Sequence, residues 1–302
     1  MNKKLIAIIA ASAAVVIAAA AVLIYVFTRE DSYRLLKMYE FQGTGSVTRD
    51  DKGEITPYAN MVLESGDKIA LDTGVMTIQA DEDKYIHLDE HTEIQLIAKG
   101  TSENSKTTIE LLRGGISNDI RNKLSADSSY EINTPNSTMS VRGTVFYTFI
   151  YEIDGVKYTR VCVFEGVVTT HLVYKDGTVE EKEVLVGAGK EVIIYEDGTT
   201  TDYLYPEPQD IDYNTIPEDV LRELRDMIDK EGKVLSITSP EITRILEGPY
   251  YVTFMYGEIE FGMQTVDKGD KATIPLLSPE PSGGWDFDFR QAIERDTTIL
   301  WK

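Results

Sequence analysis

An uninterrupted apolar run near the N-terminus constrains this 302-residue chain more than any other feature. The run begins at Leu5, ends at Phe27 and contains neither a charge nor a proline. An α-helix rises about 1.5 Å per residue, so a run of this length spans the roughly 30 Å hydrocarbon core of a bilayer. Lys3 and Lys4 precede it, and by the positive-inside rule they predict a cytosolic N-terminus. We therefore expect a single-pass membrane helix over residues 5–27, with the bulk of the chain on the outer side of the cytoplasmic membrane.

A cleaved signal peptide is the alternative interpretation of this run. The apolar core of a signal peptide usually measures about 7–15 residues and ends at a small-residue cleavage site. Ala18 and Ala20 offer such a site, but the apolar residues 22–27 extend the run beyond it. This extension favours a retained anchor, which makes the lipid bilayer the first predicted partner, through residues 5–27.

Charge and cysteine content exclude further classes of protein. The chain has 51 acidic and 30 basic side chains, a formal net charge of −21. Such a surface repels phosphate backbones, which argues against nucleic-acid binding. The single cysteine, Cys162, excludes an intrachain disulfide and lies in the apolar run 161–164, which predicts a buried strand. We expect packing alone to stabilise the exported part.

The region up to residue 203 predicts an all-β domain, which we delimit as 29–203. From about residue 39, apolar and polar residues alternate or form short β-rich runs between glycine-containing turns. Asp-Gly pairs at 154–155, 176–177 and 197–198 predict tight two-residue hairpins, because glycine accepts the positive φ of such turns. Many short antiparallel strands are typical of a sandwich, barrel or solenoid.

Residues 204–248 predict a linker with one amphipathic helix over about 216–231. Prolines at 206 and 208 break the preceding pattern, Thr215 is the expected N-cap, and Gly232 ends the helix. We expect its apolar stripe to pack on the β domain, with the docking of a partner as the alternative, and its charged face to be solvated. The stripe comprises Val220, Leu221, Leu224, Met227 and Ile228, and the charged face Glu218, Arg222, Glu223, Arg225 and Asp226.

Residues 39–195 resemble the extracytoplasmic domain of FecR-like proteins. The most specific matches are Thr134-Pro135 and Arg142-Gly143-Thr144, with weaker ones in residues 109–115 and at Gly166. The resemblance implies an all-β, somewhat solenoid-like module outside the cytoplasmic membrane. Arg142 is suited to grip a carboxylate ligand, but we favour a structural arginine that bonds backbone carbonyls or a buried acid. The motif residues that we expect to be structural are Thr134, Pro135, Arg142, Gly143, Thr144 and Gly166.

The C-terminal residues 249–302 predict a small, separate β-rich unit. Over residues 250–302 it is similar to a Listeria-Bacteroides repeat, the β-grasp-like unit also called an InlB B-repeat, found on bacterial surface proteins. The similarity rests on residues 251–254, 264–266, Gly284-Trp285 and 296–301, although the turn after Trp285 is shorter than the pattern has. One copy is present, which favours a docked terminal module over a stalk.

Four polar residues have a spacing that suggests a metal site. His87, Asp89, His91 and Glu93 share one face if they lie on a strand. However, histidines four residues apart lie about 13 Å apart on an extended strand, too far for one ion unless the chain turns at Glu90. We therefore favour a solvated outer face. Residues 197–202 also lack the oxygen spacing of a calcium loop, so no metal or other cofactor is expected.

The sequence contains no recognisable catalytic constellation. It has three histidines and lacks a nucleophile elbow, a zinc-protease helix motif and a phosphate-binding glycine loop. We therefore expect a protein that is not an enzyme.

Three functional hypotheses follow, and the first is favoured. It is a membrane-anchored cell-surface protein whose β domains bind an envelope protein or glycan. The second, implied by the FecR resemblance, is a transmembrane signalling accessory. Because only residues 1–4 precede the helix, its signal is expected to pass through a partner's membrane helix, which the alanine-rich face allows to approach closely. The third is a structural element of the wall or of adhesion, and the oligomeric state is not indicated.

Overall fold

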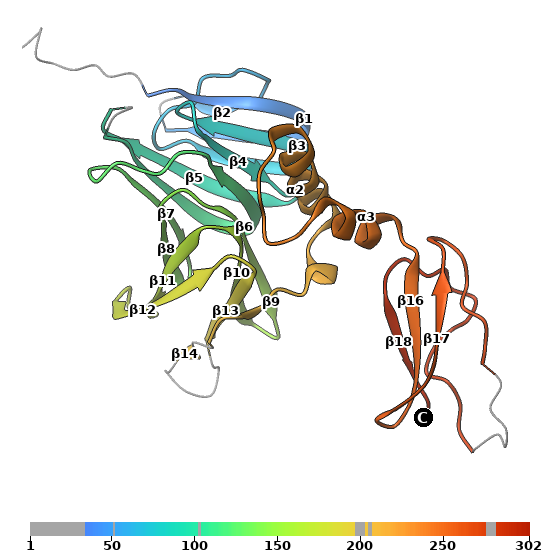
Figure 1. The fold of residues 1–302 in the computed structure, drawn as a ribbon. Coiled ribbons are helices and arrows are strands. Elements are labelled where there is room, and N and C mark those ends of the chain that lie inside the picture. The colour runs from blue at the N-terminus through green and yellow to red at the C-terminus, as the bar shows by residue number, and fades with distance from the viewer. Residues whose placement is uncertain (1–33, 51, 102–103, 197–202, 205–206, 276–281) are drawn as a thin grey trace, which may run out of the picture.

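A computed structural model describes residues 34–50, 52–101, 104–196, 203–204, 207–275 and 282–302. The predicted membrane segment from Leu5 to Phe27 and the Asp-Gly pair at 197–198 lie outside these residues. Within the described ranges, no helix has both the length and the apolar character needed to cross a bilayer. The described chain is mainly β, as predicted, with a large sheet assembly, two α-helices and a small C-terminal sheet (Figure 1).

The large assembly is one continuous hydrogen-bonded network of strands. In chain order these are β1 (Leu36–Arg49), β2 (Gly53–Ile55), β3 (Lys68–Ala80), β4 (Lys84–Leu88), β5 (Thr92–Lys99), β6 (Lys106–Ile120), β7 (Ser129–Thr134), β8 (Ser137–Val141), β9 (Val145–Ile153), β10 (Val156–Glu165), β11 (Val167–Val173), β12 (Val179–Gly187), β13 (Lys190–Glu196), β14 (Tyr203–Leu204) and β15 (Gln209–Asp210).

Two long strands fold this network into two layers. The first part of β6 pairs with β5 and β7, whereas its second part pairs with β4 and β9. Strand β3 changes partner in the same way, from β5 to β4. Its bend coincides with Gly43 of β1 and Gly74 of β3, where an added Cβ would lie 2.0 Å and 2.1 Å from a carbonyl oxygen of the opposite strand. Only glycine permits this approach. Because the two layers enclose one apolar core, the arrangement corresponds to the sandwich among the predicted folds.

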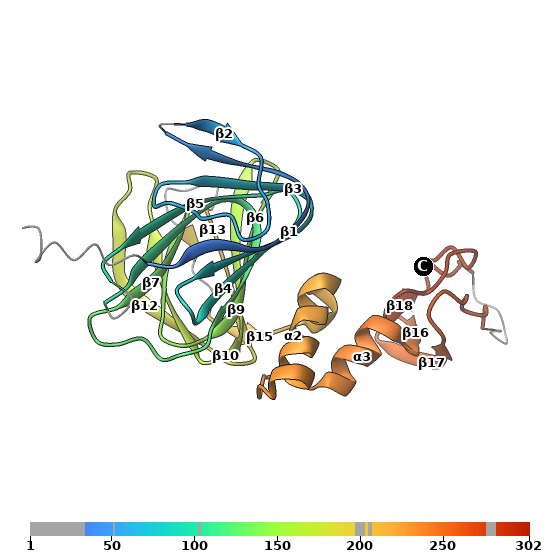
Figure 2. The same ribbon diagram turned by 90° about the horizontal axis from the view of Figure 1, so that it is seen from above.

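Apolar residues of both layers meet in the main core. Ile109 and Ile132 contribute from the layer of β6, β7, β8 and β11, while Phe146 and Val161 contribute from the layer of β9 and β10. All four side chains are almost completely buried. The outer side of the second layer carries a further apolar cluster, which the helices cover (Figure 2).

The Asp-Gly turns differ from one another. Asp154 and Gly155 both have positive φ and form the predicted two-residue turn between β9 and β10. The pair at 176–177 instead belongs to a longer loop, because the backbone of Tyr174 already pairs with that of Thr178. Gly177 supplies the left-handed residue of this loop. The prediction of a tight two-residue hairpin is therefore wrong at this second turn.

Helix α2 (Glu218–Glu231) corresponds to the predicted amphipathic helix and ends at Gly232 in the left-handed conformation. Thr215 is not its N-cap, because Asp212 first caps a short 3-10 helix (Tyr213–Thr215) and Pro217 then precedes α2. The apolar stripe packs on the β domain as expected. It contributes Val220, Leu221, Leu224 and Met227 to a cluster with Val145, Tyr147, Cys162 and Phe164 of β9 and β10.

A second helix, α3 (Ser239–Glu247), corrects the prediction of a single helix in the linker. Thr238 and Glu241 form a capping box, and Pro240 lies in the first turn. A proline in the first turn removes no helical hydrogen bond, so it is tolerated there and does not break the chain into a loop. The capping-box spacing of Thr238 and Glu241 was present in the sequence, but our prediction of the linker did not use it.

The C-terminal unit is a three-stranded sheet beyond α3 (Figure 1). It contains β16 (Tyr250–Tyr256), β17 (Ile259–Val266) and β18 (Thr297–Leu300), with β16 in the centre and β18 parallel to it. Val252, Phe254 and Ile299 form its own core, against which Trp285 and Phe289 pack. Its relation to the Listeria-Bacteroides repeat stays a prediction.

Candidate binding groove

The register of the second layer aligns polar and aromatic residues in one row. Each residue of the row lies directly opposite the next one on the neighbouring strand, across six strands. The row faces the side covered by α2. It consists of Thr77 of β3, His87 of β4, Ser117 of β6, Tyr147 of β9, Cys162 of β10 and Glu191 of β13.

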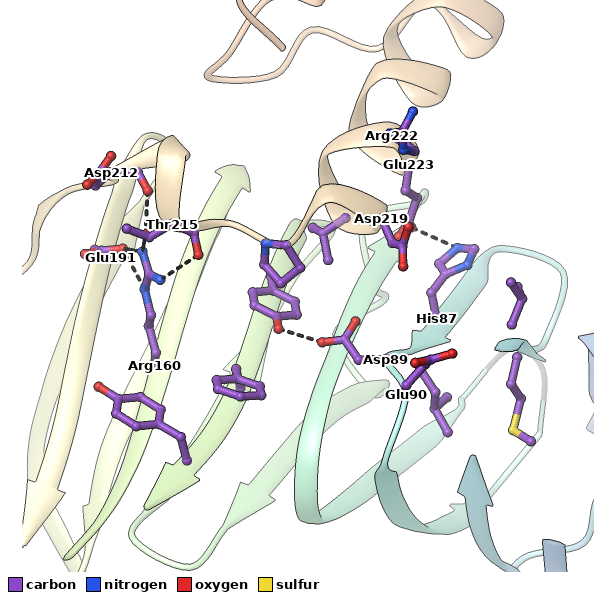
Figure 3. A pocket seen from close by; sticks show the side chains of 18 of the residues that line it. His87, Asp89, Glu90, Arg160, Glu191, Asp212, Thr215, Asp219, Arg222 and Glu223 are labelled. Carbon is purple, nitrogen blue, oxygen red and sulfur yellow. Dashed lines mark hydrogen bonds and ion pairs between the residues drawn. The ribbon is translucent and has the colours of Figure 1, made fainter. Parts of the chain in front are cut away.

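A cavity of about 1050 Å³ lies between this face and the start of α2 (Figure 3). We call it the α2 groove. Strands β3, β4, β9, β10 and β13 line one side, and residues from the segment 209–223 line the other. Its volume lies just above the range of about 300–1,000 Å³ that is usual for small-molecule sites.

Asp89 and Tyr147 meet at one end of the α2 groove. Asp89 directly follows β4, and its backbone N–H donates to the carbonyl of Gly115 over 3.0 Å. The hydroxyl of Tyr147 donates to Oδ2 of Asp89 over 2.6 Å. A Cβ on Gly115 would lie 2.3 Å from that carboxylate oxygen and 2.7 Å from the Tyr147 hydroxyl. The missing side chain of Gly115 therefore makes room for this hydrogen bond.

The carboxyl group of Asp89 is held near an excess of negative charge. Burial raises its pKa, the hydrogen bond from Tyr147 lowers it, and the negative charges of Glu223 and Asp219 raise it again, to about 6. Asp219 is exposed and makes no hydrogen bond or ion pair with any residue that the structure describes. This end of the groove therefore carries carboxylates that lack a positive partner.

His87 connects the sheet to α2 beside Asp89. Its Nε2 lies 2.9 Å from Oε1 of Glu223, and its Nδ1 lies 2.9 Å from the hydroxyl of Thr77. Burial lowers the pKa of His87, but the charge of Glu223, with smaller contributions from more distant carboxylates, raises the pKa above its ordinary value. His87 and Glu223 therefore form a contact between strand and helix that strengthens on protonation.

The expected solvated face is wrong for His87, Asp89 and Glu223, which line the groove. The chain does turn after β4, and His91 adopts a positive φ there, exposed to solvent. Glu93 lies beyond the turn on β5, where it contacts Arg113. In the described parts of the chain, no three such side chains converge as metal ligands.

The other end of the groove holds a buried ion pair. Nε of Arg160 donates to Glu191 over 2.9 Å, and its Nη2 donates to the hydroxyl of Thr215 over 2.7 Å. Gln209 donates to the second oxygen of Glu191, whose residue is 4% exposed. These bonds fasten the segment before α2 to β10 and β13. Cys162 lies beside them, and burial raises its pKa, so the thiol stays protonated in the buried strand that we predicted.

An aromatic wall joins the two ends. Tyr147, Phe149 and Tyr151 alternate along β9 on the groove side, with ring centroids 6.3 Å and 5.7 Å apart and nearly parallel planes. The stack continues to Tyr158 and then Tyr195, with centroids 5.0 Å and 5.1 Å apart. The two-residue spacing of these aromatics was visible in the sequence, but it indicated only a strand.

The family-motif residues lie outside the groove lining. The buried Thr134 hydroxyl bonds to Ser137, and the Thr144 hydroxyl donates to the carbonyl of Val167 over 3.3 Å. Gly143 and Gly166 both have a positive φ, and a Cβ on Gly166 would lie 2.7 Å from the carbonyl oxygen of Gly143. Pro135 is exposed in the turn between β7 and β8.

Arg142 does not make the bonds that we expected. Its side chain is exposed, and among the described residues it has no hydrogen bond or ion pair to a carbonyl or an acid. It therefore neither pins the neighbouring strand through such bonds nor contributes to the α2 groove.

Comparisons with known proteins found a family match and similar solved structures. No curated protein matches the chain. Two crystal structures of a candidate anti-sigma factor from Parabacteroides distasonis are similar to it, each with 11% sequence identity and a TM-score of 0.38. Both cover 78% of this chain, and the chain covers 98% and 97% of them. Residues 67–169, about a third of the chain, match the family described as FecR protein, and this stretch contains His87, Asp89, Tyr147 and Arg160.

Proposed function

We propose that this chain is a non-catalytic, FecR-type binding protein of the cell envelope that takes a partner protein in the α2 groove. It is held in the cytoplasmic membrane by residues 5–27. The observation that carries the proposal is the groove itself, a large aromatic-walled cavity, of which the residues that match the FecR family form about half the lining.

The chemistry of the groove supports a protein partner. Tyrosine, phenylalanine and arginine are enriched in protein interfaces, and energetic hot spots lie in pockets of this kind. The volume of about 1050 Å³ also exceeds what a single side chain fills. A segment of several residues can therefore lie along β9, with one side chain at each end of the groove.

The FecR match favours signalling as the purpose of this binding. In such a role the chain is an accessory that reports binding outside the membrane to a regulatory partner within it. The contact between His87 and Glu223 provides a structural reason, because an occupant of the groove touches α2 and the sheet at the same time.

Site-specific photocrosslinking in intact cells tests the groove. A photoreactive phenylalanine analogue replaces Tyr151, which is half-buried in the groove, or Tyr58, which is 61% exposed outside it. We expect one defined protein adduct from position 151 and none of the same identity from position 58. Absence of a groove-specific adduct contradicts the proposal. An adduct with wall glycan shows that the groove binds a glycan and contradicts a protein partner.

Fractionation tests the membrane anchor separately. We expect the protein in the membrane pellet, with its C-terminal half open to protease added outside the cell. Protection from external protease, or a mature chain free in the medium, contradicts the anchored topology.

A further inference from the structure

We propose that the α2 groove recognises a lysine or arginine side chain carried on an extended segment of the partner protein. This inference rests on the proposed function and specifies the chemistry of its partner. It follows from charge complementarity between the carboxylates of the groove and the group that they lack.

The Asp89 end of the groove has more negative than positive charge. Asp89, Glu90, Asp219 and Glu223 contribute four carboxylates to this part of the cavity lining, and Glu90 accepts a hydrogen bond from the backbone N–H of Gly74 over 2.7 Å. His87 is the titratable base beside them, and it contacts Glu223. Asp89 has only the neutral hydroxyl of Tyr147 as its side-chain hydrogen-bond partner in the described structure. When these carboxylates are ionised, negative charge therefore exceeds positive charge here even if His87 is protonated.

The arginines of the groove do not supply the missing charge. Arg160 is engaged by Glu191 and Thr215 at the opposite end. Arg222 pairs with Glu218 one turn earlier on α2, over 3.0 Å. Figure 3 shows Arg160 and Asp89 on separate sides of the cavity.

The walls of the groove fit the rest of a long basic side chain. Val75 and Pro217, which are exposed and line the cavity, offer apolar surface to an alkyl stem. The half-buried rings of Phe149 and Tyr151 line the cavity, and the face of an aromatic ring attracts a cation because it carries negative partial charge. The remaining volume along β9 accommodates the backbone on either side of the basic residue.

Ionisation of the groove supports the same occupant. An ammonium group stabilises the ionised form of Asp89, so binding releases a proton and strengthens as the pH rises through about 6. Protonated His87 acts as an internal competitor for Glu223 at low pH, which weakens binding in the same direction. The groups that face this pair are Thr77, Glu90, Tyr147, Asp219 and Glu223, with Asp119 and Glu40 as more distant charges acting on His87.

Peptide binding to the full chain in lipid nanodiscs tests the inference. The probes are fluorescent pentapeptides of alanine with a central lysine, norleucine or glutamate, measured by anisotropy. Norleucine keeps the alkyl stem and removes the charge. We expect the lysine peptide to bind at least tenfold more tightly than either of the others at pH 8, and this preference to fall below threefold at pH 5.

Variants assign the preference to the groove. Asp219→Asn removes an exposed charge that makes no bond to the described residues, and Asp89→Asn removes the half-buried one. Each is expected to reduce the preference for lysine over norleucine to threefold or less. Glu258→Gln, at the exposed hairpin tip of the C-terminal unit, removes the same charge elsewhere and should keep the full preference.

Each other outcome overturns the inference. Equal binding of lysine and norleucine peptides indicates an apolar groove, and a preference that survives Asp219→Asn and Asp89→Asn locates the cation elsewhere. Lysine that is acetylated at its α-nitrogen and amidated at its carboxyl group keeps the side-chain ammonium but lacks the neighbouring residues. If it binds as tightly as the lysine pentapeptide, the groove does not recognise an extended segment. If position 151 still crosslinks a protein, the proposed function stands while its basic specificity fails; if position 151 crosslinks nothing, the proposed function itself fails.

Discussion

The two ends of the α2 groove differ in whether their charged side chains have a partner of opposite charge. At one end, Arg160 and Glu191 neutralise each other, and Thr215 and Gln209 satisfy their remaining hydrogen bonds. At the other end, the half-buried Asp89 lies beside further carboxylates and has a phenol as its partner. A closed ion pair fastens elements together, whereas an uncompensated carboxylate retains interaction energy for a ligand. We call the end with Arg160 and Glu191 the fastening end and the end with Asp89 the receptive end, and both lie on one face of the sheet.

Breaking the closed end should have the largest effect. Arg160→Met leaves Glu191 buried without its cation, which we expect to cost about 3–5 kcal/mol of unfolding free energy. Urea denaturation measures this loss. Arg222→Met is the matched control, because it breaks an exposed pair with Glu218 and should cost less than about 1 kcal/mol. Similar losses in both variants would remove the distinction between the two ends as we describe it.

Filling the space beneath Asp89 should have the next largest effect. Gly115→Ala places a Cβ against the carboxylate and the Tyr147 hydroxyl, and such overpacking costs about 1–3 kcal/mol. Thermal unfolding of the variant is the measurement. Gly187→Ala on β12, where no atom lies within 4 Å of the added Cβ, should leave stability nearly unchanged. A harmless Gly115→Ala would show that Asp89 and Tyr147 do not need this space.

The variant Asp89→Asn, which removes the half-buried carboxylate, should stabilise the protein by about 1–2 kcal/mol at pH 8. The pKa of Asp89 is about 6 in the folded chain against 3.8 ordinarily, so the unfolded chain ionises more readily. Folding stability therefore falls as the pH rises between these values and stays reduced above them. Asp89→Asn abolishes this loss, and its benefit should disappear near pH 4. Urea denaturation at both pH values checks the sign, and a benefit that persists at pH 4 contradicts it.

The smallest effect on stability is expected from Asp219→Asn. The side chain is exposed and makes no bond to the described residues, so unfolding free energy should change by less than about 0.5 kcal/mol. Its charge nevertheless raises the pKa of Asp89, so the variant should lower that pKa. NMR titration of the Asp89 carboxyl carbon measures the shift, with Asp229→Asn at the far end of α2 as the control. An unchanged titration would separate Asp219 from the receptive end.

Local patterns predicted much of the fold and little of the groove. The period-two runs predicted the strands, Asp154-Gly155 predicted its turn, and the stripe that includes Leu224 predicted the packing of α2. His87 and Asp89 were noticed only as evenly spaced polar residues. Their partners, Glu223 and Tyr147, lie far along the chain and carried no signal of the pairing.

The amino-acid sequence by itself determined where the strands, turns and α2 form, because side-chain alternation and backbone preferences act within a few residues. It also determined the similarity of residues 67–169 to the FecR family. Only the tertiary structure decided that one row joins His87, Tyr147 and Glu191, because the pairing of strands that are distant in the sequence determines which residues lie opposite one another. Burial and missing counter-charge, which no local pattern encodes, then turn Asp89 into the receptive end of a groove.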